Sequence, residues 1–162
     1  MTNSRAKGNR FIAVDPGPEQ SALVHFDASS MSPERSVILD NPDALEEIRT
    51  FSGAAVIEMI SSYGMPVGQD VFETIYWIGR FAEAARVHHL VYRKDVKMHL
   101  CQSMRAKDSN IRQALIDRFP KTGGGKVPQV GTKGQPGPLF GIRKDLWAAL
   151  AVAITFCERE AG

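Results

Sequence analysis

The sequence has little cysteine, little net charge and no long hydrophobic run. Its two cysteines, Cys101 and Cys157, lack metal-type spacing, which excludes a disulfide framework and predicts buried reduced thiols. No apolar run approaches the roughly 18 residues of a membrane span. Met1 to Arg10 is polar and basic, without the apolar centre of a signal peptide. We therefore expect a cytoplasmic protein with no membrane partner.

The composition is that of an ordinary globular chain. With 162 residues, 43% hydrophobic and 23% charged, one domain spanning residues 1–162 is expected, preceded by a basic arm at 1–9. The net charge of +2 does not by itself demand a nucleic-acid partner. The basic residues nevertheless gather in three stretches, 86–97, 105–107 and 121–144, which favours local contacts with phosphates.

The stretch from Phe11 to Val14 is apolar throughout and is followed at once by Asp15, Pro16 and Gly17. Such a run closed by a turn signal predicts a buried strand that presents its acid at the edge of the core. Gly17 lets the backbone turn without crowding the carboxylate. The alternative is that Asp-Pro-Gly is ordinary turn chemistry.

The remaining elements follow from periodicity and turn signals. Strands are predicted at 21–26, 36–39, 54–57 and 88–92, and helices at 41–49, 69–87, 95–102, 109–119 and 143–160. The first three strands are expected to form an antiparallel meander. Asn41 is expected to cap the first helix, with Pro42 as its first residue.

The helix predicted at 69–87 carries more apolar residues than one face requires. Helical spacing places Val71, Ile75, Ile78, Ala82 and Ala85 on a core stripe. Phe72, Tyr76, Trp77 and Phe81 widen that stripe. Either the helix is fully buried, or a second subunit covers part of it.

Two segments have loop composition. Residues 60–67, with Tyr63 and Met65, are expected to overhang a site. Residues 120–141 hold seven glycines, four prolines and three lysines, and predict a mobile basic loop.

Three acids stand at the ends of buried elements. Asp15 ends the first strand, Glu58 ends the strand at 54–57, and Asp145 lies in the first turn of the last helix. Parallel neighbouring strands would bring Asp15 and Glu58 to one edge of the sheet, where crowded carboxylates call for a hard divalent cation. Alternatively, Glu58 faces solvent and Asp145 interacts with the helix N-terminus.

This order of elements resembles the RNase H-like superfamily, and more specifically the RuvC-type Holliday junction resolvases. The resemblance rests on Ile12 to Gly17, Val56 to Glu58 and Asp145 to Cys157, and it spans nearly the whole chain. It implies an α/β fold with a mixed five-stranded sheet, a three-stranded antiparallel meander plus parallel strands, flanked by helices. It also implies that Asp15, Glu58 and Asp145 hold Mg²⁺, for which Mn²⁺ can substitute.

The family pattern assigns further site residues, with one departure. A second acid is usual one turn along the last helix, where this chain has Ala148, so Asp108 is either a fourth ligand or a helix N-cap. Lys97 and Lys107 correspond to lysines that contact DNA, Lys107 at the scissile phosphate, unless both belong to a solvated face. Tyr63 and Met65 are expected to contact opened bases, and Lys121, Lys126 and Lys133 the DNA backbone.

The resemblance implies a Mg²⁺-dependent, structure-selective DNA endonuclease that resolves four-way junctions by paired phosphodiester cleavage. Because each chain has one set of acids, paired cleavage predicts a homodimer formed through helix 69–87. Its expected anchors are Phe72, Tyr76 and Trp77. Two alternatives stay open. One is an RNase H-like nuclease on RNA or RNA–DNA hybrids, and the other is a non-catalytic nucleic-acid-binding module of the same fold.

Overall fold

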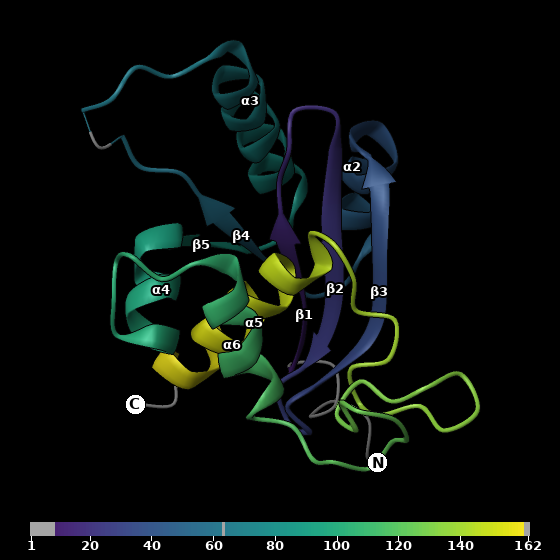
Figure 1. Cartoon of the computed structure of the whole chain (residues 1–162). Coiled ribbons are helices and arrows are strands. Elements are labelled where there is room, and N and C mark those ends of the chain that lie inside the picture. Colours follow the sequence, from purple (N-terminus) through teal and green to yellow (C-terminus); the bar gives the residue numbers. More distant parts are fainter. Residues whose placement is uncertain (1–8, 63, 161–162) are drawn as a thin grey trace.

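The structure is a computed structural model, and it describes residues 9–62 and 64–160. A five-stranded sheet in the order β3-β2-β1-β4-β5 forms its centre (Figure 1). The strands are β1 (Arg10–Asp15), β2 (Gln20–Asp27), β3 (Ser32–Asp40), β4 (Ala54–Met59) and β5 (His88–Tyr92). β1, β2 and β3 are antiparallel neighbours, whereas β4 pairs parallel with β1, and β5 with β4. The predicted mixed RNase H-like sheet is confirmed.

The helices agree with the predicted ones except at their ends. They are α2 (Asn41–Thr50), α3 (Gln69–Ala84), α4 (Arg93–Cys101), α5 (Asp108–Ile116) and α6 (Leu146–Glu160). The prediction that α3 continues to Val87 was wrong, because Ala85 is extended and the Val87 carbonyl accepts a hydrogen bond from Ala55 at the sheet edge. Among the described residues, no helix is long and apolar enough to cross a bilayer.

Side chains of the strands alternate between two helical layers. Phe11 and Ala13 of β1 belong to a core shared with α6, α5 and α4, whereas Ile12 and Val14 belong to a core shared with α2 and α3. Figure 1 shows α6 crossing the sheet, with α4 and α5 beside it. Because Ala13 of β1 pairs with Val56 of β4, the odd-numbered residues of β1 and the even-numbered residues of β4 face the same helices.

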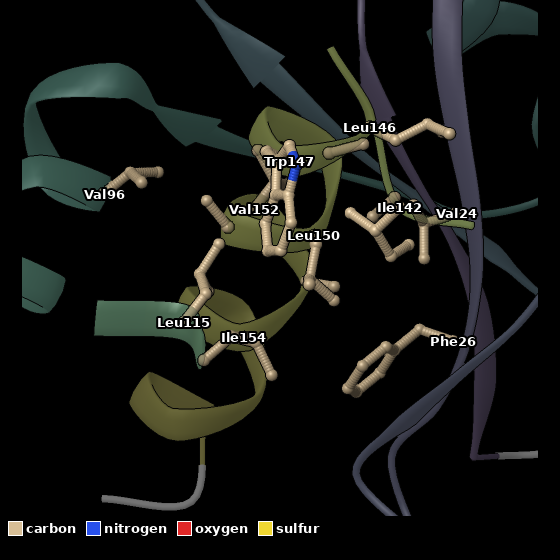
Figure 2. Close-up of a cluster of buried hydrophobic side chains, with 14 of the residues drawn as sticks. Val24, Phe26, Val96, Leu115, Ile142, Leu146, Trp147, Leu150, Val152 and Ile154 are labelled. Atoms are coloured by element: carbon tan, nitrogen blue, oxygen red, sulfur yellow. The ribbon is translucent and has the colours of Figure 1, made fainter. Parts of the chain in front are cut away.

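Helix α6 is buried almost all round from Leu146 to Thr155. Its alanines let its backbone approach the sheet closely, and Leu146 and Leu150 lie opposite Val24 and Phe26 of β2 (Figure 2). Towards its end, Cys157 is a free thiol, as is Cys101. Both are half-buried, where the prediction had buried reduced thiols.

Of the predicted core stripe of α3, only Ile78 is fully buried. The buried residues of the helix are Thr74, Ile78 and Phe81, whereas Ile75 is 39% exposed. Thr74 tolerates this position because its hydroxyl donates to the Asp70 carbonyl at 2.7 Å. Phe72 and Tyr76 are 57% and 62% exposed, so the fully buried alternative was wrong.

Residues 120–141 have a defined backbone. The Gly123 amide donates to the Pro128 carbonyl, and the Gly137 amide donates to the Val130 carbonyl. Gly131 has φ 77°, and a Cβ on it would lie 2.3 Å from the Gly137 nitrogen, so only glycine fits there. The predicted mobility of this loop stays a prediction. Figure 1 shows the loop near the β2–β3 turn, from where the chain continues into α6.

Candidate active site

Asp15 and Glu58 lie side by side at the carboxyl ends of β1 and β4. The parallel register pairs Val14 with Ile57, so the next residue on each strand is an acid. Both have the parity of Ala13 and Val56, whose side chains pack on the α6 layer. Glu58 is 5% exposed, so the alternative that it faces solvent was wrong.

Asp145 stands immediately before α6, which begins at Leu146. The prediction that it lies within the first turn was wrong by one residue. Lys144, with φ 49°, turns the chain, and the Asp145 carbonyl then accepts the first helical hydrogen bond, from Ala149. The acid therefore flanks the helix N-terminus, where negative charge is favourable.

The acids share one cleft of about 570 Å³. Four acids line it, Asp15, Glu58, Asp108 and Asp145, together with three basic side chains, Arg93, Arg112 and Lys144. Ala148 also lines it, at the position where the family pattern has an acid. The cleft thus brings together acids from β1, β4, α5 and the start of α6.

Burial and mutual repulsion raise the free energy of the ionised forms of Asp15 and Glu58, and so raise their pKa values. Burial, followed by the charges of Glu58 and Asp145, raises the pKa of Asp15 to about 8. Burial also raises the pKa of Glu58, although the Arg93 guanidinium opposes this. At neutral pH the cleft therefore favours a cation or a proton beside these carboxylates.

A buried polar network fixes the turn that follows Asp15. The Asn41 amide donates to the Gly17 carbonyl at 2.9 Å, and the Ser21 hydroxyl donates to Asn41 Oδ1 at 2.6 Å. The Gly17 amide in turn donates to Ser21 Oγ at 3.2 Å. The prediction that Asn41 caps α2 was therefore wrong, since Asp40 occupies the N-cap position.

The donor chemistry of the cleft fits a hard divalent cation. Carboxylate oxygens are the ligands that Mg²⁺ prefers, and the excess of buried negative charge would be offset by one. Within residues 9–62 and 64–160, however, no three histidine, cysteine, aspartate or glutamate side chains are already arranged as a metal-holding group. The ligand role of Asp15, Glu58 and Asp145 stays a prediction.

Asp108 lines the cleft, whereas the predicted lysines Lys97 and Lys107 do not. Asp108 is the first residue of α5, so it is not the N-cap, which is Lys107. Lys107 is exposed, and its backbone amide donates to Asn110 Oδ1 at 2.9 Å, but it does not line the cleft. Lys97 is half-buried, and its charge opposes the rise that burial causes in the pKa of Glu58.

Four cleft residues were given no site role by sequence reasoning, which noted Arg93 and Lys144 only as parts of basic stretches. They are Arg93, Arg112, Lys144 and Trp147. The Arg112 guanidinium lies 4.6 Å from the centre of the Trp147 ring, and Trp147 Nε1 is buried without a hydrogen-bond partner among the described residues. A signal existed for Arg93, because it directly follows the strand parallel to β4.

The other predicted DNA contacts that the structure describes do not line the cleft. Met65 is 73% exposed on the segment after β4, and Tyr63 lies outside the described residues. Lys121, Lys126 and Lys133 are exposed on the 120–141 loop. Their roles stay predictions.

Known structures share this fold, although the sequence shows no close relationship. No protein-family model matches the chain, and no curated protein matches it in sequence. A structure of Thermus thermophilus RuvC matches with a TM-score of 0.59 and 16% identity, over 94% of this chain and 96% of that one. T. thermophilus RuvC in complex with Holliday junction substrate matches with a TM-score of 0.61 and 15% identity, over the same shares. The chain therefore has the RuvC fold that the resemblance in its sequence predicted.

Proposed function

We propose that this protein is a Mg²⁺-dependent, structure-selective DNA endonuclease that resolves four-way junctions by paired phosphodiester cleavage. The observation that carries the proposal is the juxtaposition of Asp15 and Glu58 at the ends of parallel strands, with Asp145 in the same cleft. A non-catalytic module would have no use for buried, mutually repelling carboxylates. The fold match to RuvC in complex with a Holliday junction supports the choice of substrate.

In this proposal Asp15, Glu58 and Asp145 hold the cations, with Mn²⁺ able to replace Mg²⁺. When bound, such cations activate a water and stabilise the leaving oxygen of a phosphodiester. The chain itself fixes the geometry. The two strand ends set the spacing of Asp15 and Glu58, and the network of Asn41, Ser21 and Gly17 holds the turn behind Asp15.

The basic side of the cleft would hold the phosphate. Arg112 and Lys144 line it beside the acids, and Arg112 is steadied by its contact with Trp147. Lys107, predicted to steady the scissile phosphate, stands exposed at the start of α5, outside the cleft lining. Phosphate contacts of this kind position a strand without reading its sequence.

Paired cleavage requires two active sites, and α3 is the surface we propose for joining two subunits. Phe72, Ile75 and Tyr76 form an exposed apolar row on it. Trp77, the third predicted anchor, is half-buried and packs against Phe81 at 5.8 Å between ring centres, so Phe72 and Tyr76 are the better anchors.

Light scattering at micromolar concentration tests this pairing. We expect a mass near twice 17.8 kDa for the wild type and near 17.8 kDa for Tyr76→Glu. Phe140→Glu, which changes an exposed aromatic residue on the 120–141 loop, is the control and should remain dimeric. A monomeric wild type would contradict paired cleavage.

A cleavage assay tests the function itself. Four-way junction, linear duplex, flap and RNA–DNA hybrid substrates are incubated with the protein, with Mg²⁺ or with a chelator. We expect symmetrical cuts in the junction only when Mg²⁺ is present. Preferential cutting of the hybrid would favour an RNase H-like activity, and binding without any cutting would favour the non-catalytic module.

A further inference from the structure

Arg93 bridges two carboxylates of the cleft. Its Nη2 donates to Asp108 Oδ1 at 2.9 Å, and its Nη1 lies 3.6 Å from Glu58 Oε1. One guanidinium thus joins the buried strand end of β4 to the start of α5. No other basic side chain forms a recorded ion pair with either acid among the described residues.

The backbone brings Arg93 to this place. β5 pairs parallel with β4, with Tyr92 opposite Met59, so the residue after Tyr92 emerges at the edge where Glu58 lies. Arg93 is also the first residue of α4, and a positive charge at a helix N-terminus is unfavourable. The two carboxylates offset that cost and hold the side chain over the cleft.

The two ion pairs are unequal. The Glu58 side chain is 7% exposed, whereas that of Asp108 is 90% exposed. An exposed pair contributes little stability, but a buried carboxylate without a partner is costly. The guanidinium therefore matters chiefly to Glu58, and Asp108 acts as a tether at the mouth of the cleft. Since the Arg93 side chain is 39% exposed, it has room to move outward while keeping that tether.

We propose that Arg93 is a built-in counter-ion of the cleft, which competes with the divalent cation for Glu58 and stays tethered by Asp108 when the cation displaces it. This rests on the proposed metal site. It assigns Asp108 the role of a positioning residue in place of that of a fourth ligand. The displaced guanidinium would remain at the cleft mouth, where the phosphate of a DNA strand must pass.

Calorimetric titration with Mn²⁺, without DNA, tests the competition. Arg93→Ala should bind Mn²⁺ about tenfold more tightly than the wild type, because no positive charge has to leave Glu58. Lys94→Ala is the matched control, since it removes the same charge from the next residue, which does not line the cleft, and its affinity should equal that of the wild type. Equal or weaker binding by Arg93→Ala would overturn the proposal.

Failure of this inference is distinguishable from failure of the proposed function. If neither the wild type nor Arg93→Ala binds Mn²⁺, the metal site itself is contradicted, and this inference with it. Should Arg93→Ala fold poorly without metal, Arg93→Gln replaces it. Thermal unfolding then gives a second readout, in which added Mn²⁺ should raise the unfolding temperature of the Arg93 variant more than that of the wild type.

The tether is tested in the background that lacks Arg93. Adding Asp108→Asn to Arg93→Ala should change Mn²⁺ affinity by less than about threefold, because Asp108 then has no guanidinium to hold. A loss of about tenfold or more would show that Asp108 acts on the cation without Arg93, as a ligand or its direct support does, and would overturn its role as tether.

Discussion

Glu58 and Glu158 are both at least partly buried, but they differ in their basic partners and in the direction of their pKa shifts. Glu158, near the end of α6, accepts hydrogen bonds from Arg118 at 3.0 Å and from His99 at 2.9 Å. Burial acts to raise its pKa, but these two partners outweigh burial and lower it. Glu58 is more deeply buried and has one distant guanidinium, and its pKa is raised.

The same contrast recurs elsewhere. Glu47 is hydrogen-bonded by Arg35 and His25, and the pKa of Glu47 is lowered. Asp15 accompanies Glu58 and has its pKa raised to about 8 by burial and by neighbouring acids. Carboxylates that join elements of the fold are fully paired, whereas those of the cleft are left short of positive charge. Under-compensated acids are the ones to which we assign a cation.

The largest effect expected from this contrast is on cleavage. Glu58→Gln should lower the rate of junction cleavage by more than about a hundredfold, since even residues that only support a ligand cost tenfold to a hundredfold when changed. Glu158→Gln should leave the rate unchanged, because Glu158 lies about 20 Å further along the axis of α6 than Asp145. Single-turnover cleavage of a four-way junction by both variants measures this. Equal losses would erase the distinction between the two kinds of acid.

The next effect is on stability and its pH dependence. The folded-state pKa of Asp15 is raised from 3.8 to about 8, so the folded protein binds more protons than the unfolded chain in that interval. Without metal, its contribution to stability therefore falls as pH rises from about 4 to about 8. Asp15→Asn should remove this dependence and raise the free energy of unfolding at pH 8 by on the order of 5 kcal/mol. Urea unfolding at pH 5 and pH 8 measures both, and an unchanged pH profile would contradict the assignment.

Neutralising an acid that is paired with basic side chains should lower the free energy of unfolding, in contrast to Asp15→Asn. Glu158→Gln should lower the free energy of unfolding at pH 7 by about 1–2 kcal/mol, because Arg118 and His99 lose a charged partner that is partly exposed. Urea unfolding of Glu158→Gln and Asp15→Asn under the same conditions measures this difference. A stabilising Glu158→Gln would show that pairing is not what separates the two groups.

The smallest effect concerns charges far from the cleft. Replacing Lys121, Lys126 and Lys133 together by alanine should leave the cleavage rate at saturation unchanged. It should flatten the slope of log affinity against log salt by up to about 0.9 per lysine, for junction and duplex alike. Fluorescence anisotropy at several salt concentrations gives the slope, and an unaltered value would exclude the loop from DNA binding.

Local patterns were sufficient for the strands and for the position of the acids. The apolar runs before Asp15 and Glu58 each form a buried strand that leads directly into the acid, so strand pairing alone brings the acids together. Patterns of this kind cannot tell which side of an apolar helix meets the sheet. For that reason the sequence did not predict Thr74 as a buried residue of α3, although it did predict Ile78.

Contacts between distant segments could not be predicted from the sequence, for a different reason. The Asn41 amide reaches Gly17 across 24 positions, and Arg93 reaches Asp108 across 15. Either side chain, viewed within its own segment, had an ordinary local explanation, as a cap or as part of a basic stretch. Their roles follow from the sheet order, which places segments from different parts of the chain at one edge.

The effect of Mg²⁺ on stability at pH 8, compared between the wild type and Asp15→Asn, tests most directly whether the under-compensated acids hold a cation. A cation that binds only the folded wild type should raise its free energy of unfolding by about 1.4 kcal/mol at ten times the dissociation constant. Asp15→Asn, which lacks one ligand and starts out more stable, should gain much less. Equal gains in the two proteins, or none in the wild type, would contradict the account.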